Sequence, residues 1–253
     1  MGRLGVLVEK ELRQVRWVLW VGLGLTLLVG LSLPYFYRFL SRIAGAGAML
    51  PGLSGEILRQ LADFRVYLWA NWYGKNLYQN LTVIALVLGA GALAGERARG
   101  TLPFLLTLPV SRRQAVAAKV MAGAVVLALC TVIPTLGVWA ASPWLGGESA
   151  PEGFLLGMPL AWAGSLVVLG VAVLASVFAH DGVRAGVGAG VVCLALAVPG
   201  WFRSTFFLSF FWHMKAFAIM AGPGFPWASL LVLLGAALVL FWASTVAVGC
   251  RDL

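Results

Sequence analysis

The sequence predicts an all-α polytopic membrane protein. Hydrophobic residues make up 61% of the 253 positions and charged residues only 11%, and the mean hydropathy is +0.95. Soluble domains carry roughly 25% charged residues, so a soluble globular fold is excluded. Several apolar stretches are long enough to cross about 30 Å of hydrocarbon as helices. We therefore expect a single transmembrane domain, 1–253, with six membrane-spanning helices.

The predicted spans alternate with connections that are charged or rich in Gly and Pro. They cover residues 17–37, 77–95, 115–140, 157–179, 183–200 and 227–249. The first connection, 38–76, is expected outside the membrane, and Ser54 within it can cap a helix. Trp69, Trp72 and Tyr73 are suited to the lipid headgroup region, where amphipathic rings concentrate.

Segment 201–226, between the fifth and sixth spans, permits two interpretations. It is aromatic-rich, is interrupted by Arg203, His213 and Lys215, and ends in a Gly-Pro cluster. A seventh span would place the two termini on opposite sides of the membrane. We favour a re-entrant or interfacial segment, because both termini then lie in the cytoplasm, the side on which Lys and Arg accumulate.

The net charge and the cysteines indicate which partners and sites are to be expected. A formal charge of +9 is accounted for by topology signals and by contact with anionic membrane lipid, so no nucleic acid is expected as a partner. Cys130, Cys193 and Cys250 are scattered over apolar runs without a C-x-x-C pair. This pattern favours free thiols over a disulfide or a metal site.

Residues 1–16 are predicted to form an amphipathic helix in the membrane interface. Apolar side chains recur at helical spacing on one face: Leu4, Leu7, Val8, Leu12 and Val15. Charged side chains occupy the other: Arg3, Glu9, Lys10, Arg13 and Arg16. The apolar run that follows has about 20 residues, more than the core of a signal peptide. We expect it to be retained as the first span.

Segment 96–114, between the second and third spans, is the most informative part of the sequence. Charged residues bracket a short apolar stretch: Glu96, Arg97, Arg99, Arg112 and Arg113 surround Leu102, Phe104, Leu105 and Leu106. The stretch is too short to cross a bilayer and too apolar to remain in water. We therefore expect a short cytoplasmic coupling helix that docks into a partner protein.

Local signals define this short helix. Gly100 and Pro109 are expected to end helices, and Thr101 is expected to cap the short one between them. Ser111 and Gln114 form a capping box that starts the third span. The sequence thus encodes a short apolar helix tied at both ends to membrane spans.

The same segment resembles the signature of ABC-2 type ABC transporter permeases. The matching residues are Glu96, Gly100-Thr101-Leu102, Leu105-Leu106, Pro109-Val110-Ser111-Arg112 and Lys119, and Lys10-Glu11-Leu12 resembles the family's amphipathic connecting helix. The resemblance implies a non-catalytic permease with the type V exporter fold in a bacterial cell membrane. It also implies a second permease chain, identical or related, and separate ATPase subunits that bind ATP and Mg. The residues implied in ATPase coupling are Glu96, Arg97, Gly100, Thr101, Leu102, Phe104, Leu105, Leu106, Pro109, Arg112 and Arg113.

The sequence itself contains no G-x-x-x-x-G-K-[ST] loop, so this chain is not expected to bind ATP phosphates. Two glycine pairs, Gly91 with Gly95 and Gly186 with Gly190, have the small-xxx-small spacing that lets helices approach closely. In the family the second and fifth spans face the dimer axis, so the pairs are candidate dimer contacts. Ordinary helix packing is the alternative, since Gly is common in membrane helices.

Polar residues at the outer start of the second span are candidates for lining a translocation path. Lys75, Gln79 and Thr82 recur at helical spacing, and polar groups at membrane depth normally face protein or water. A helix end standing in water is the favoured interpretation of these residues. At the other side, Asp181 begins a turn between spans and Arg184 is a candidate second cytoplasmic contact. A proton relay there is the less favoured interpretation.

These features predict a permease subunit of an ABC exporter that forms its path as a dimer. An ion-coupled secondary transporter is the alternative, but it normally requires charged groups at membrane depth, and the centres of the predicted spans contain almost none. A membrane scaffold or regulator coupled to an ATPase is a third interpretation. An intramembrane hydrolase is disfavoured, because no catalytic constellation occurs at membrane depth.

Overall fold

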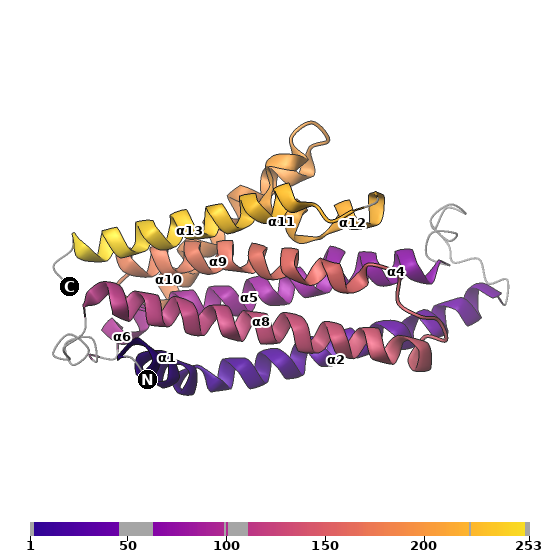
Figure 1. Ribbon diagram of the computed structural model, residues 1–253, viewed down its shortest axis with the longest axis horizontal. Coiled ribbons are helices and arrows are strands. Elements are labelled where there is room, and N and C mark those ends of the chain that lie inside the picture. Colours follow the sequence, from indigo (N-terminus) through magenta and orange to yellow (C-terminus); the bar gives the residue numbers. More distant parts are fainter. Residues whose placement is uncertain (1–2, 46–62, 99, 101–110, 223, 251–253) are drawn as a thin grey trace.

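Figure 1 shows an elongated bundle whose long helices run along one axis. This computed structural model describes residues 3–45, 63–98, 100, 111–222 and 224–250, and the regular structure in these residues is helical. Among the described residues, five helices are long and apolar enough to cross a membrane: Arg16–Arg42, Arg113–Leu145, Phe154–Phe178, Gly182–Trp201 and Trp227–Gly249. The chain is therefore a multi-pass helical membrane protein, as predicted.

The N-terminal helices meet at a bend. α1 (Arg3–Gln14) and α2 (Arg16–Gly45) are separated by a turn at Val15. α1 packs against α8, and its partly buried Leu12 and Val15 contact the core. α2 continues past Tyr37, the predicted end of the first span, through the mixed polar and apolar residues 38–45 to Gly45.

α8 (Arg112–Leu145) begins at the predicted capping box. The Ser111 hydroxyl accepts a hydrogen bond from the Gln114 N–H at 3.2 Å. In return, the Gln114 side chain accepts one from the Ser111 N–H at 3.0 Å. Two otherwise unsatisfied N–H groups are thereby paired, and the predicted capping box is confirmed.

The predicted second span, 77–95, is part of a longer helical stretch that is divided in three. It consists of α4 (Phe64–Asn71), the π-helical turn η1 (Trp72–Asn76) and α5 (Leu77–Ala90). The Asp63 carboxylate caps its start by accepting from the Arg65 N–H at 2.8 Å. Ser54, the predicted cap, lies outside the described residues.

This stretch ends earlier than predicted, at Ala90, and a turn over residues 91–93 leads into α6 (Ala94–Ala98). The Leu93 N–H donates to the Ser176 hydroxyl at 3.1 Å instead of to a carbonyl of its own helix. Gly89 and Gly91 flank the end of α5, and glycine is a poor helix former. A competing side-chain acceptor and low helix propensity together account for the break.

The prediction that Trp69, Trp72 and Tyr73 lie among lipid headgroups was wrong. Their exposed fractions are 1%, 0% and 0%, so they belong to the protein core. The Trp72 indole N–H donates to the Thr135 hydroxyl at 3.2 Å, and the Tyr73 hydroxyl donates to the Phe154 carbonyl at 2.7 Å. These partners satisfy the polar tips of Trp72 and Tyr73, which removes the need for a water-facing position of these two rings.

α9 (Met158–Phe178) is the central helix and follows the 3-10 turn η2 (Phe154–Gly157). It packs against α5, α8, α10, α11 and α13. A Cβ atom added to Gly89 of α5 would lie 2.5 Å from the Ala172 Cβ of α9. The two backbones thus approach more closely than side chains would permit.

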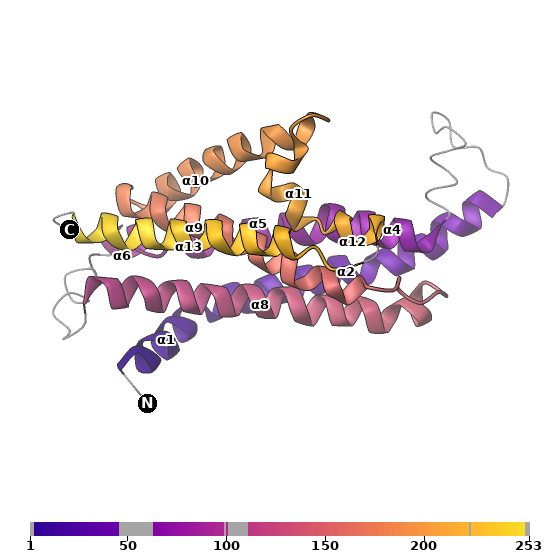
Figure 2. The same ribbon diagram turned by 45° about the horizontal axis from the view of Figure 1, so that its top comes forward.

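The last part of the chain contains two long helices with short ones between them. The long ones are α10 (Gly182–Ala197) and α13 (Trp227–Gly249); the short ones are η3 (Val198–Trp201), η4 (Phe206–Leu208), α11 (Phe210–Met214) and α12 (Phe217–Ala221). Figure 2 shows α10 running outward and α11 returning to the bundle, where α11 contacts α9.

The described part of segment 201–226 is therefore not a seventh span. Its helices have five residues or fewer, too few to cross a bilayer. Ala216 has φ 56°, a left-handed conformation that ends α11 before α12 begins.

The two ends of the bundle differ in content (Figure 1). α1, α6, the start of α8 and the end of α13 lie together at one end, which we call the α6 end. The end of α2, the start of α4 and the end of α8 lie at the opposite end, which we call the α4 end.

Candidate functional site

α6 carries the first two residues of the predicted coupling segment into contact with the bundle. Glu96 lies in the middle of this five-residue helix and is only 3% exposed. Successive side chains on a helix point in different directions. Glu96 and Arg97 consequently contact different helices.

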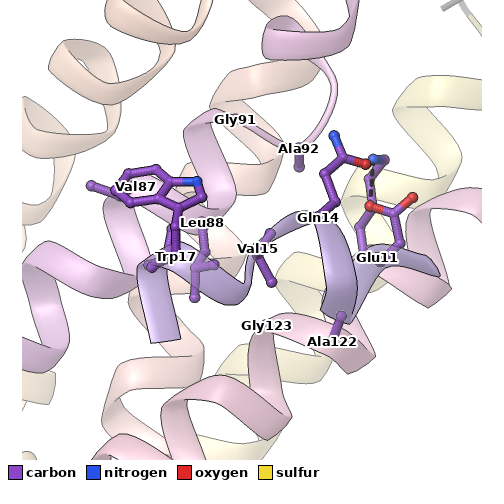
Figure 3. A pocket seen from close by; sticks show the side chains of 12 residues that line it. Glu11, Gln14, Val15, Trp17, Val87, Leu88, Gly91, Ala92, Ala122 and Gly123 are labelled. Atoms are coloured by element: carbon purple, nitrogen blue, oxygen red, sulfur yellow. Dashed lines mark hydrogen bonds and ion pairs between the residues drawn. The ribbon is translucent and has the colours of Figure 1, made fainter. Parts of the chain in front are cut away.

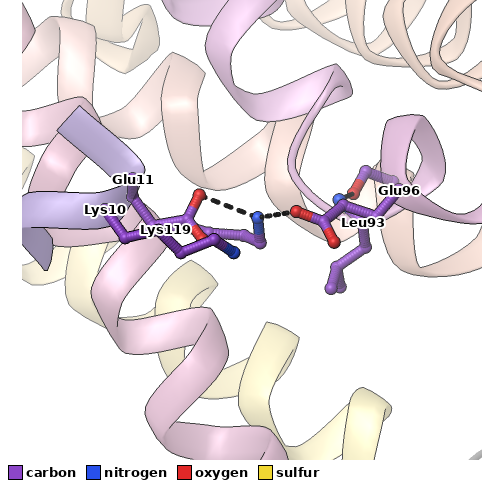
Figure 4. Close-up of polar contacts among 6 residues, drawn as sticks. Lys10, Glu11, Leu93, Glu96 and Lys119 are labelled. Carbon is purple, nitrogen blue, oxygen red and sulfur yellow. Dashed lines mark hydrogen bonds and ion pairs between the residues drawn. The ribbon is translucent and has the colours of Figure 1, made fainter. Parts of the chain in front are cut away.

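Glu96 belongs to a buried ionic cluster with Glu11 and Lys119 (Figure 4). The Lys119 Nζ lies 2.7 Å from the Glu96 Oε1 and 2.9 Å from the Glu11 Oε2. The Lys119, Glu96 and Glu11 side chains are 7%, 4% and 6% exposed. The Lys10 Nζ lies 3.3 Å from the other Glu11 oxygen, but its side chain is 47% exposed. The cluster joins α1, α6 and α8, which are distant in the sequence.

The charge balance of this cluster makes Lys119 its critical member. One buried ammonium is shared by two buried carboxylates. Removing ions from water costs several kcal/mol per ion unless close partners compensate. Short charge-assisted hydrogen bonds provide that compensation here. Loss of the shared cation would leave two carboxylates in a poorly hydrated site.

Arg97 connects α6 to α9. Its guanidinium donates a hydrogen bond to the carbonyl oxygen of Ala179, the residue that ends α9. A cation is favourable there because the last carbonyls of a helix lack intrahelical partners and carry partial negative charge. Together with the Leu93–Ser176 hydrogen bond, this contact fixes α6 and its preceding turn to α9.

Small residues pack α5 and α6 against α10. Ala90, Ala94 and Ala185 form a compact buried cluster, and a Cβ atom added to Gly186 would lie 3.6 Å from the Ala90 Cβ. A Cβ atom at Gly190 would meet nothing within 4 Å among the described residues. Gly186 thus has a packing partner within the chain, and the dimer role of the glycine pairs stays a prediction.

A cavity of about 140 Å³ lies beside the ionic cluster, at the bend between α1 and α2 (Figure 3). Glu11 and Lys119 contribute charged groups to its wall, and Trp17, Leu88 and Gly91 contribute apolar surface. Gly95, the partner of Gly91 in the predicted pair, lies partly exposed in α6. Packing is therefore incomplete where α1 meets α5, next to the contacts that hold α1 in place.

The apolar part of the predicted coupling segment lies outside the described residues: Thr101, Leu102, Phe104, Leu105, Leu106 and Pro109. Its flanks are described. Gly100 has φ +68°, the left-handed conformation typical of the residue that follows a helix. Arg112 begins α8, and Arg113 beside it is exposed. α6 and the start of α8, the described elements on either side of this segment, lie together at the α6 end.

The turn between α9 and α10 lies at the same end (Figure 1). Asp181 caps α10, because its Oδ1 accepts from the Arg184 N–H at 2.9 Å. Its other oxygen lies 3.3 Å from the Arg184 Nε, and the two side chains are 37% and 72% exposed. The predicted second contact is thus an accessible pair, and its contact with an ATPase stays a prediction.

The three predicted path residues do not stay together. Gln79 and Thr82 line a cavity between α5, the end of α10 and α11, whereas Lys75 is exposed in η1 and is not part of its wall. The π-helical turn changes the helical register on which the prediction relied. Lys215, which was not predicted as a site residue, also lines this cavity, with its Nζ 4.8 Å from the centre of the Tyr78 ring. Burial lowers the pKa of the Lys215 ammonium.

Glu11 and Lys119 were not among the predicted site residues, but the sequence around each of them indicates a buried charge. Glu11 lies three residues after Val8 and four after Leu7, so it falls on the apolar face of α1. Lys119 lies within the apolar run of the predicted third span. A charge inside an apolar stripe normally indicates a buried partner.

Comparison with known proteins gives one family. No curated protein sequence matches the chain. The family model described as ABC-2 family transporter protein matches residues 6–207, a range that contains the ionic cluster and most of the helices. Because this match covers most of the sequence, the chain belongs to the ABC-2 transporter family.

Proposed function

We propose that this chain is the permease subunit of an ABC exporter, acting as a dimer with separate ATPase subunits. The ATPases would bind ATP and Mg, and this chain would form the membrane path. The observation that carries the proposal is the Glu11–Lys119–Glu96 cluster. It attaches α6, the helix that leads into segment 101–110, to α1 and α8.

These attachments support a mechanical role for α6. Ionic contacts join it to α1 and α8, Arg97 joins it to α9, and small residues pack it against α10. A displacement of segment 101–110 by a partner would therefore move several helices together. ATP-driven closure of the ATPases would in this way reopen the path on the opposite side of the membrane.

We place the α6 end in the cytoplasm. Among the residues that the structure describes, the α6 end carries more basic residues (Lys10, Arg13, Arg16, Arg97, Arg113 and Arg184) than the α4 end (Arg38, Arg42 and Arg65). Positive charge beside membrane helices marks the cytoplasmic side. Both α1 and the end of α13 then face the cytoplasm. The stretch from Phe64 to Ala90 is about 40 Å long at 1.5 Å per residue. We propose that it also crosses the membrane, in addition to the five long apolar helices.

Affinity co-purification in mild detergent tests the proposal. The native chain is compared with a Leu105→Glu, Leu106→Glu double variant, which places two carboxylates in the predicted docking stretch. Ser149→Glu is the matched control, since it adds a carboxylate at the exposed turn of the α4 end. We expect a separate ATPase to accompany the native chain and the control but not the double variant.

One result would contradict the proposal as a whole, and a second would contradict the assignment of the docking stretch. If no ATPase accompanies the well-folded native chain, the coupling assignment fails and the ion-coupled or scaffold interpretations take its place. If the double variant retains the ATPase, the ATPase docks elsewhere on this chain.

A further inference from the structure

The cavity between α5, α10 and α11 is not explained by contact with an ATPase. Its volume is about 350 Å³, in the range of small-molecule sites. Most of its wall is aromatic or aliphatic, including Tyr78, Val83, Leu194, Trp201, Phe211 and Trp212. It is separate from the ionic cluster, which contributes no residue to it.

Lys215 is the charged group of this cavity. Its Nζ lies over the Tyr78 ring, 4.8 Å from the ring centre, and its side chain is partly buried. Among the ion pairs of the described residues, none includes Lys215. An aromatic face compensates a desolvated ammonium only in part. The site therefore favours an anion beside Lys215.

The remaining polar residues indicate which donors an anion would meet. The Thr82 hydroxyl already donates to the Tyr78 carbonyl at 2.7 Å, and the Ser209 hydroxyl donates to the Leu196 carbonyl at 3.4 Å. The Lys215 ammonium and the Gln79 amide are further donors in the wall, together with the Tyr78 hydroxyl and the indole N–H groups of Trp201 and Trp212. No residue in the wall is acidic, so a cationic ligand would lack a counter-charge.

The apolar surface of the cavity indicates the rest of the ligand. Val83, Leu194 and Trp201 line it and are 60%, 65% and 74% exposed. Apolar surface of this extent is stabilised by contact with an aliphatic chain. A ligand that satisfies both the ammonium and this surface has an anionic head and an apolar tail.

We propose that this cavity binds a single-chain anionic amphiphile, with the head group at Lys215 and Gln79 and the aliphatic chain along Val83, Leu194 and Trp201. The α11 segment positions the cation: the His213 ring nitrogens lie 2.8 Å from the Ser229 hydroxyl and 2.8 Å from the Phe207 carbonyl oxygen. Lys215 follows directly after this anchored turn.

Photolabelling tests the site in the full chain, purified with its accompanying subunits into phosphatidylcholine nanodiscs. The probe is a dodecyl sulfonate with a diazirine near the chain end, because a sulfonate stays anionic. Matched probes carry a neutral amide or a trimethylammonium head. Labelled peptides are located by mass spectrometry, and unlabelled dodecyl sulfonate competes to give a half-saturating concentration.

We expect sulfonate labelling within residues 78–83 and 194–215, and weaker labelling by the other two probes. Lys215→Met should raise the half-saturating concentration at least tenfold, the factor that corresponds to about 1.4 kcal/mol. Lys75→Met, at the exposed lysine outside the cavity, should change it less than twofold. Lys215→Arg should retain most of the affinity.

Equal labelling by all three probes in the native chain, or labelling outside the cavity, would overturn the proposal, and this comparison needs no variant to fold. An unchanged affinity in well-folded Lys215→Met would overturn it as well. Binding here requires no ATPase, so failure of this site would leave the proposed permease function standing.

Discussion

Replacing Lys119 with methionine is the sharpest test of the buried ionic cluster. Methionine keeps an unbranched side chain that reaches as far as Cε, and it removes the ammonium group with its charge and its hydrogen bonds. The contacts of Lys119 with Glu96 and Glu11 measure 2.7 and 2.9 Å, and all three side chains are nearly buried. The substitution would leave two carboxylates close together without their shared cation.

The expected loss of stability follows from this geometry. Removing one partner of a buried ion pair typically costs about 3–5 kcal/mol. The upper part of that range applies, because two buried carboxylates lose the same partner. For chains of this size, 1 kcal/mol corresponds to roughly 2–4 °C in melting temperature. We expect a loss of about 4–5 kcal/mol, which corresponds to a decrease of about 8–20 °C in melting temperature.

Thermal unfolding in mild detergent, followed by circular dichroism, measures this decrease. Lys10→Met is the matched control, since it makes the same change at a lysine that is 47% exposed; we expect it to cost less than about 1 kcal/mol. Glu11→Gln and Glu96→Gln should each cost less than Lys119→Met, because each leaves one carboxylate with its lysine.

A neutral triple variant separates charge from shape. Lys119→Met combined with Glu11→Gln and Glu96→Gln removes the unpaired carboxylates, so it should recover at least half of the stability lost in Lys119→Met. The reasoning is refuted if Lys119→Met melts with the native protein. It is also refuted if the triple variant is as unstable as the single one.

Three other substitutions test the packing and hydrogen bonds around α6. Gly89→Val should destabilise the protein by about 1–3 kcal/mol, because a Cβ atom there would lie 2.5 Å from the Ala172 Cβ. A melting temperature equal to that of the native protein would contradict this close approach of α5 and α9. Ser176→Ala removes the acceptor of the buried Leu93 N–H and should cost about 1–3 kcal/mol, with faster amide exchange at Leu93 in hydrogen–deuterium exchange. Ser111→Ala removes the cap of α8 and should cost about 1 kcal/mol; protection of the first turn of α8 that matches the native protein would argue against the capping box.

The sequence was most informative where the physics is local. Apolar composition and the spacing of charged breaks predicted a multi-pass helical protein, because the bilayer requires long apolar helices. The capping box of Ser111 and Gln114 is confirmed, because it depends on residues three positions apart. Gly100 has the left-handed conformation expected after a helix, since only glycine adopts it without steric cost.

Tertiary structure decided where polar and aromatic side chains find partners. Trp72 appeared suited to lipid headgroups, but Thr135 on another helix accepts its N–H, so the ring is buried. The break after Ala90 depends on a hydroxyl supplied by Ser176 of α9. Periodicity within one segment carries no information about an acceptor on another.

The charged residues of the candidate site also find their partners on other helices. The sequence alone determined that a short apolar stretch bracketed by charged residues follows the second predicted span, and that the chain resembles a permease family. It did not reveal that Glu11, Glu96 and Lys119 meet, or that Lys215 lies over Tyr78. Those contacts depend on how the helices pack, and a buried charge is stable only when the packed structure brings its partner within hydrogen-bond distance.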